Sequence, residues 1–175
     1  MKAKLLVFLA VIILAGCTSI PVPTPQQNTL LAGKLIVNWV PTDKAWTKNE
    51  SVKSGIKVYF KDEDTGKITL VITQKEGWLL TNKLNGSNYS IQKFFIEIKQ
   101  GNTIYSMTLN GPSNITLENG AVNNIGIIQI DIENNKYSLK RIDYDTVKLD
   151  FQANFSDSEW NSYDWKNINI FANIK

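Results

Sequence analysis

The sequence has no histidine and only one cysteine, Cys17, in 175 residues. Without histidine, the chain cannot build a Ser-His-Asp or Cys-His catalytic group, an imidazole metal site or the usual general base near neutral pH. A single cysteine cannot form a disulfide within the chain, so folding must be driven by burial alone. The sequence also has no HExxH motif and no glycine-rich phosphate loop. These absences favour a protein that is not an enzyme and that holds no cofactor and no metal.

Net charge and long apolar runs are also scarce. The chain has 19 basic and 16 acidic residues, and two of the basic ones, Lys2 and Lys4, precede the first apolar run. The remainder is nearly neutral, which gives no electrostatic reason to expect nucleic acid as a partner. The apolar run covers residues 5–15, whereas a helix that spans a bilayer needs about 20 residues. A positive start, a short apolar stretch and small residues after it are typical of a removable secretion signal.

The residues that end this run, Leu14-Ala15-Gly16-Cys17, resemble the lipobox of bacterial lipoproteins. The resemblance implies that residues 1–16 are a signal peptide, that a diacylglycerol is attached to Cys17, and that the new amino terminus is acylated, as with palmitate. Two or three acyl chains give a stable membrane anchor, whereas one chain holds a protein only marginally. The alternative is an ordinary signal peptide followed by a chance cysteine. An Asp after the cysteine would favour the inner membrane, so Thr18 favours the outer one in a bacterium with two membranes.

The chain after Cys17 divides into a linker and one domain. Residues 17–30 carry three alternating prolines, Pro21, Pro23 and Pro25, and no charge, which predicts a semi-extended linker beginning at the lipidated cysteine. At about 3.1 Å per residue, such a linker could hold the domain up to about 40 Å from the lipid. The alternative is a disordered N-terminus. Residues 31–175 are enough for a single domain with a core of its own.

From residue 31 onward, apolar residues alternate with polar ones, which predicts short β-strands separated by turns. Residues 42–54 form a polar loop, and the phase of the alternation places Ile68, Leu70 and Ile72 inward. The phase slips near Gln92 and Lys93, which predicts a β-bulge there. The strands are expected at residues 31–40, 55–61, 67–73, 78–80, 89–99, 103–109, 115–117, 128–132, 137–142, 147–155 and 167–174, with the clearest alternation at 147–155. So many short strands predict an all-β fold, an antiparallel β-sandwich or a barrel.

One segment carries a helix signal. Ser156 and Glu159 have the spacing of a capping box, and Trp160 follows them. The pattern predicts one short helix near residues 157–165.

Part of the chain resembles the prealbumin (transthyretin-like) or carboxypeptidase-regulatory-like β-sandwich. The matching stretches are GIKVYF at 55–60, DTGK at 64–67, Thr73 with Gly77-Trp78, and Leu84-Asn85-Gly86 before Tyr89. Residues 123–128 are also similar to a stretch of small bacterial surface lipoproteins that contain such domains. The resemblance implies a prealbumin-like antiparallel sandwich that serves as a binding or spacer module, and it implies no catalytic residue.

Two acidic groups could carry other chemistry. Asp62-Glu63-Asp64 could bind Ca²⁺ through oxygen atoms, but it lacks the spacing of an EF-hand loop, and a solvated hairpin turn is favoured. Asp143 and Asp145 have the spacing of two carboxylates on one side of a strand, as a catalytic pair would. Charged residues at the end of a strand are commoner, and we favour that interpretation.

Three aromatic residues, Trp160, Tyr163 and Trp165, crowd one short segment. If exposed, their rings could stack on sugars or anchor a ligand; if buried, they pack the helix against a sheet, which we favour. The remaining tryptophans, Trp39, Trp46 and Trp78, are expected in the core or at its rim.

The sequence therefore predicts a lipid-anchored protein of the bacterial cell envelope whose β-sandwich presents a surface to a protein partner without catalysing a reaction. The alternative is a lipoprotein that binds a carbohydrate or small ligand through Trp160, Tyr163 and Trp165. Its contact with the membrane would be through the lipid on Cys17.

Overall fold

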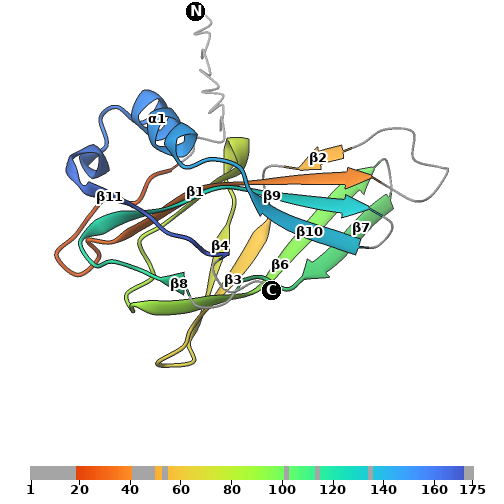
Figure 1. The fold of residues 1–175 in the computed structure, drawn as a ribbon, viewed down its shortest axis with the longest axis horizontal. Helices are drawn as coiled ribbons and strands as arrows, with labels where there is room; N and C mark the ends of the chain where they lie inside the picture. Colours follow the sequence, from red (N-terminus) through yellow and green to blue (C-terminus); the bar gives the residue numbers. More distant parts are fainter. Residues whose placement is uncertain are drawn as a thin grey trace, which may run out of the picture.

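The computed structural model describes residues 19–40, 50–52, 55–100, 103–112, 115–133 and 136–171. These residues form two stacked β-sheets and one α-helix (Figure 1). The predicted signal peptide, Cys17, Trp46 and the end of the last predicted strand lie outside the described residues. Within them, no helix is long and apolar enough to cross a membrane.

The first sheet, here called sheet 1, is built on two long strands, β1 (Leu30–Val40) and β9 (Ala121–Glu133), which run parallel. The other strands of sheet 1 are β2 (Glu50–Val52), β5 (Trp78–Thr81), β10 (Lys136–Arg141) and β11 (Asp164–Asn167). The second sheet, sheet 2, has the order β4-β3-β6-β7, with β8 beside β6. Its strands are β3 (Lys57–Asp62), β4 (Ile68–Ile72), β6 (Asn88–Gln100), β7 (Thr103–Leu109) and β8 (Ile115–Thr116).

The predicted all-β sandwich is therefore confirmed. One detail differs, because sheet 1 is mixed: β1 and β11 both run parallel to β9, whereas every pair in sheet 2 is antiparallel. The short strand β2 lies inside the predicted polar loop at residues 42–54. The predicted β-bulge is also confirmed, because Tyr59 pairs with Lys93 while Phe60 pairs with Ile91, so Gln92 is the extra residue.

The main core fills the space between the two sheets. Ile128, Ile130 and Ile132 of β9 face Phe94 and Ile96 of β6, and all five side chains are buried. Each buried residue alternates with one that is less buried along its strand, as a half-buried strand requires. The sandwich is stabilised by this apolar burial, at about 25 cal/mol per Å² of apolar surface.

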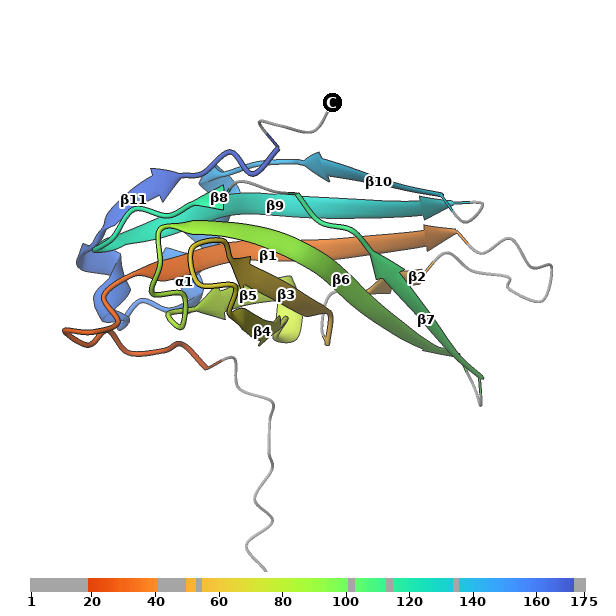
Figure 2. The ribbon, with the colours of Figure 1, turned by 90° about the horizontal axis from the view of Figure 1, so that it is seen from below.

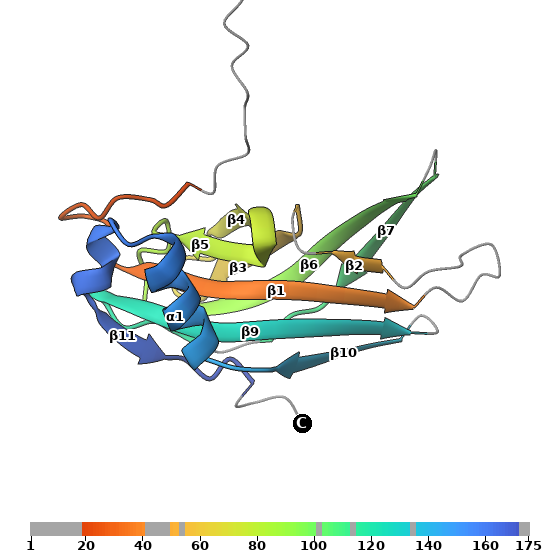
Figure 3. The same ribbon diagram turned by 90° about the horizontal axis from the view of Figure 1, so that it is seen from above.

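A second core lies on the opposite face of sheet 1, under the helix α1 (Asp145–Asn154) and the 3-10 turn η2 (Glu159–Ser162). Figure 3 shows the helix lying across this face. Trp78 of β5 packs edge-on against Phe151, with ring centroids 6.0 Å apart. Phe151 also contacts Phe155 and Trp165, at 5.0 and 5.2 Å. One end of the molecule therefore has three layers, which are helix, sheet 1 and sheet 2.

The helix predictions need correction. Residues 147–155, predicted as a strand, lie mostly in α1, and residues 157–165 hold only the turn η2 before β11 begins. The capping box does not form, because the Ser156 hydroxyl bonds to Asp157 and η2 has no side-chain cap. The single short helix therefore begins about twelve residues earlier than predicted. The predicted strand at residues 167–174 is also displaced, because β11 ends at Asn167.

The phase of β4 is also opposite to the prediction. Ile68, Leu70 and Ile72 are 53%, 43% and 48% exposed, while Val71 between them is buried. The hairpin that precedes β4 sets this phase, because it pairs Val58 with Val71 and Val58 lies in the core. A shift of one residue reverses the face of every side chain in a strand.

Residues 19–29 lie against the sandwich as a strap. The Gln74 side-chain amide donates to the carbonyl of Ser19 (2.8 Å). The Trp160 indole N–H donates to the carbonyl of Pro21 (2.5 Å), and Asn82 donates to that of Val22 (3.2 Å). This part of the predicted linker is therefore bound to the domain and is not a free spacer.

Candidate functional site: the two open sides of the sandwich

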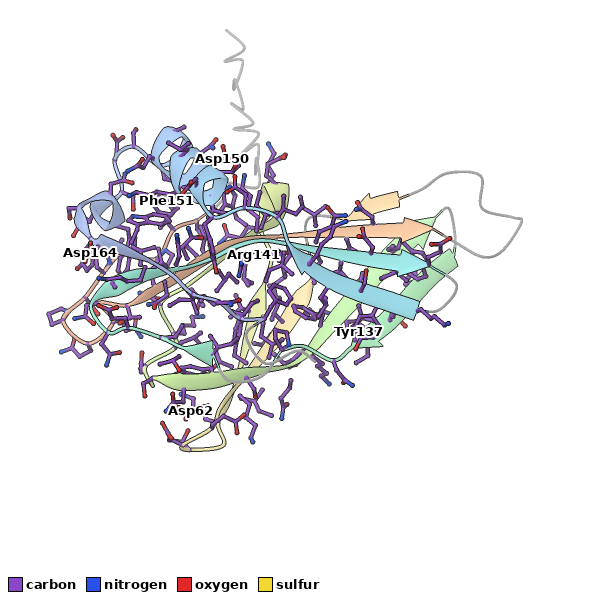
Figure 4. All side chains as sticks on the ribbon, in the orientation of Figure 1. Asp62, Tyr137, Arg141, Asp150, Phe151 and Asp164 are labelled. Carbon is purple, nitrogen blue, oxygen red and sulfur yellow. The ribbon has the colours of Figure 1, made fainter. Side chains whose placement is uncertain are left out.

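The acidic residues Asp62-Glu63-Asp64 lie at the hairpin turn between β3 and β4. The backbone N–H groups of Asp64 and Thr65 both donate to one carboxylate oxygen of Asp62 at 2.9 Å. These bonds, led by the one from Thr65, lower the pKa of Asp62, which stands at the end of the hairpin in Figure 4. The preference for a hairpin turn is confirmed. Within the described residues, no group of three acidic or cysteine side chains is placed to hold a metal ion.

Asp143 and Asp145 do not face each other as a pair. Asp143 accepts the N–H groups of Asp145 and Thr146 (3.0 and 3.2 Å) and the Thr146 hydroxyl, so its carboxylate satisfies the open start of α1. The Thr146 hydroxyl and these N–H groups lower the pKa of Asp143. The carboxylate is used to begin a helix, and the second acid is part of that helix.

The three aromatic residues near the C-terminus are packed into the second core. Trp160 is fully buried, and its ring lies 4.7 Å from that of Tyr163. Tyr163 and Trp165 are half-buried against the same cluster. Stacking on a sugar needs an open ring face, and the buried ring of Trp160 cannot provide one. Of the other tryptophans, Trp78 is buried and Trp39 packs at the rim of the main core, as expected.

With these groups accounted for, the open features are the free edges of the two sheets (Figure 2). We name the side that carries β4, β5 and residues 19–29 the strap side, and the opposite side the β10 side. Within the described residues, β4 pairs only with β3 and β10 pairs only with β9. Each strand therefore has one row of backbone N–H and C=O groups that no neighbouring strand uses.

The free edge on the strap side is apolar. Ile68, Leu70 and Ile72 form an exposed stripe on β4, here called the β4 stripe. An open groove of about 350 Å³ lies between Leu70 and Ile72 on one wall and the strap residues Ser19 and Pro21 on the other.

Lysines flank the β4 stripe. Lys57 and Lys61 of the neighbouring strand β3 pair directly with Ile72 and Ile68, and the exposed Lys75 and Lys83 lie in the segments that follow β4 and β5. Lys57 lies over the ring of Phe95, 4.9 Å from its centroid, and forms an ion pair with Glu97 (3.0 Å). The acidic side chain Glu63 bonds to Lys61 (3.0 Å) and to Ser90. The surface around the stripe thus combines apolar side chains with lysines, of which Lys57 and Lys61 have acidic partners.

The free edge on the β10 side is polar and carries one large aromatic side chain. Tyr137 is 41% exposed, and its hydroxyl donates to the carbonyl of Asn110, beyond the end of β7 (3.4 Å). It lines a hollow of about 320 Å³ together with Asp131, Glu133 and Lys136. Figure 4 shows Tyr137 on β10, far from the helix end of the molecule.

The charges of the β10 side are arranged on the outer face of sheet 1. Lys140 forms an ion pair with Asp131 (2.9 Å), and Asn38 and Gln129 donate to the same carboxylate (2.8 and 2.6 Å). Lys140 and these two amides lower the pKa of Asp131. The network holds the surface beside the hollow in one polar arrangement.

Sequence reasoning identified β4 and β10 as strands but did not identify them as edges. Position in a sheet depends on long-range pairing, and no local pattern records it. The β4 stripe could not be predicted either, because the alternation of apolar and polar residues does not show which set of side chains points inward.

No family model, curated protein or solved structure matches the chain. The candidate site therefore rests on the geometry of these two sides alone.

Proposed function

We propose that the chain is a lipid-anchored protein of the bacterial cell envelope, not an enzyme, that binds a protein partner along the free edge of β10. The observation that carries the proposal is β10 itself, a six-residue edge strand with little buried surface and an exposed tyrosine. The lipid on Cys17 would hold the domain at a membrane, which in a two-membrane bacterium would be the outer one. A prealbumin-like or carboxypeptidase-regulatory-like binding module would suit this role.

The direction of the backbone groups supports a polypeptide ligand. The Ile142 N–H donates to the carbonyl of Ile127 (2.8 Å), and antiparallel partners alternate between bonded and non-bonded pairs. By this alternation, the N–H and C=O groups of Tyr137 and Leu139 point away from β9. Another extended strand is the ligand that pairs with such a row, as in recognition by strand addition.

The side chains around β10 suit a protein interface. Tyrosine is enriched at interface centres because its ring buries a large area and its hydroxyl keeps a polar contact. The strand carries three basic residues and no acidic one. Lys140 is paired with Asp131, but Lys136 and Arg141 form no ion pair among the described residues, so an acidic strand is the better electrostatic match. The exposed basic side chains also discourage pairing with a second copy of β10, which would place like charges together.

The partner is tested by photo-cross-linking in the native envelope. A photoreactive residue in place of Lys136 is expected to give one discrete protein adduct in illuminated cells. Tyr137→Pro removes one outward N–H without breaking a bond to β9, so the adduct should be lost. Tyr137→Phe keeps the N–H and the ring and should retain the adduct. An adduct that survives Tyr137→Pro, or no adduct at all, contradicts strand pairing at β10.

The anchor is tested separately by mass spectrometry of the protein from its native membrane. A form that begins at Cys17 and carries acyl mass is expected, and Cys17→Ala should abolish both features. An unmodified form that begins at another residue would contradict lipidation while leaving the β10 proposal open to its own test.

A further inference from the structure

We infer that the strap side rests on the lipid bilayer, with the β4 stripe against the headgroup region. The inference deepens the proposed function, because it takes from it the lipid on Cys17 and names the face of the sandwich that meets the membrane. The occupant of the β4 stripe is then a lipid surface and not a second protein.

Only a short length of chain would separate the lipid on Cys17 from the first residue that is bonded to the domain. Ser19 is held by Gln74 through a 2.8 Å hydrogen bond, and Thr18 is the only residue between Ser19 and Cys17. Two residues span at most about 7 Å. A lipidated Cys17 would therefore hold the carbonyl of Ser19, and Gln74 with it, close to the headgroups.

The strap fixes which side is held there. Beyond Ser19, the carbonyls of Pro21 and Val22 accept bonds from Trp160 and Asn82. Near its end, the Thr29 hydroxyl accepts the N–H of Gly120 (3.0 Å). These contacts join the strap to several loops, so it cannot swing away without breaking all of them. The β4 stripe ends at Ile72, two residues before Gln74, and so lies beside the point of attachment.

The chemistry of the strap side fits a bilayer surface. The apolar side chains of the β4 stripe would enter the headgroup boundary, as the apolar face of an interfacial segment does. Lys57, Lys61, Lys75 and Lys83 surround the stripe and would face anionic headgroups. The acids on this side are the exposed Glu76, Glu63, which pairs with Lys61, and Glu97, which pairs with Lys57 (3.0 Å). Lys75 and Lys83 form no ion pair among the described residues and carry the positive charge that remains. Contact with lipid also removes the hazard of an apolar free edge, which would otherwise invite pairing with other chains.

The inference is tested with the full lipidated protein in vesicles of phosphatidylethanolamine and phosphatidylglycerol. Because Cys17 is the only cysteine and its sulfur would carry the lipid, one added cysteine takes a fluorescent label alone. A label at Leu70→Cys is expected to be quenched strongly by spin-labelled lipid, whereas the matched label at Lys136→Cys on the β10 side is not. Equal quenching at both positions, or stronger quenching at position 136, overturns the inference.

A second pair of variants tests the strap. Gln74→Ala combined with Asn82→Ala removes two of the bonds that hold it, and quenching at position 70 should fall several-fold as the domain moves away. Gln92→Ala, an exposed amide on β6, is the control and should change nothing. Quenching that persists in the double variant would show that the strap does not set the orientation, and this part of the inference would fail.

The two proposals fail in different ways. If Cys17 is not lipidated, the protein does not float with the vesicles, and the anchor has failed before any quenching is read. If the label at position 70 is shielded only when envelope extract is added, β4 binds a protein and the bilayer contact is overturned. Loss of the adduct at position 136 affects only the proposed partner.

Discussion

At the residue scale, two glycines have nearly the same backbone conformation, but only one of them lacks space for a side chain. Comparing them separates the cost of backbone strain from the cost of a steric clash. Gly126 and Gly66 have φ values of +75° and +71°. A Cβ at Gly126 would lie 2.7 Å from the carbonyl oxygen of Asp143, whereas a Cβ at Gly66 meets nothing within 4 Å. Gly66→Ala should therefore cost only the conformational penalty of about 1 kcal/mol, and Gly126→Ala about 1–3 kcal/mol more. Urea unfolding measures both, and equal costs would contradict the crowding at Gly126.

The carboxylate of Asp143 should make stability depend on acid pH. Its pKa is lowered by the bonds from Thr146 and the start of α1, so the charged form is favoured in the folded state. The contribution of such a group is present above its unfolded pKa, near 4, and is lost as pH falls through the lower folded value. Asp143→Asn should lower Tm at pH 7 and weaken the loss of Tm below about pH 4.

Thermal unfolding between pH 7 and pH 2.5 checks this expectation. Asp157→Asn removes an acidic charge from an exposed loop without touching a helix start and serves as the control. If the Tm of Asp143→Asn changed with pH in parallel with the Tm of the unaltered protein, the Asp143 carboxylate at the start of α1 would make no pH-dependent contribution to stability.

At the element scale, α1 shows how one sequence can fit two periods. Val147, Phe151 and Phe155 are four residues apart and lie on one helix face, but with Leu149 and Ala153 they also alternate as in a strand. The helix is favoured by contacts with residues outside this segment. Asp143 satisfies its first N–H groups, and Lys34 of β1 binds Asp150 at 2.5 Å. Such tertiary contacts override a local period.

The difference between the two periods can be measured at two positions of α1. Phe151 is fully buried and Leu149 is 65% exposed; Figure 4 shows Phe151 between the helix and sheet 1. Phe151→Ala should cost about 3–5 kcal/mol of unfolding free energy, whereas Leu149→Ala should change it by no more than about 0.5 kcal/mol. A strand would bury both side chains, so similar costs in urea unfolding would contradict the helix.

Most strands, by contrast, could be predicted, because their signals are local. The strand at residues 103–109 was predicted with its observed bounds, and Gln92 was predicted at the bulge because the period slips there. The phase of β4 could not be predicted in the same way. Ile68, Leu70 and Ile72 are the apolar set, yet the hairpin register buries Val71. Turn geometry decided the face, and hydrophobicity did not.

At the scale of the whole molecule, the candidate site could not be predicted from sequence patterns. The β10 side and the strap side are defined by which strands lie at sheet edges, and those positions follow from pairs far apart in the chain, such as β1 with β9. The strap likewise depends on Gln74 and Trp160, which lie more than fifty residues beyond Ser19 and Pro21. The proline pattern predicted a semi-extended segment, but it indicated neither the tight turn between Thr24 and Gln27 nor the residues that hold the segment.

Because the two sides are separate surfaces, membrane contact and partner binding should be independent. Residues on opposite sides of the sandwich share no neighbours, and the effects of distant substitutions usually add. Leu70→Asp should weaken contact with lipid, because a charge enters the β4 stripe, yet leave the cross-link at position 136 unchanged. Tyr137→Pro should do the reverse, removing the adduct while quenching of the label at position 70 stays the same. If either variant affected both measurements, the two sides would be coupled, and a domain held rigidly by its strap would no longer account for the arrangement.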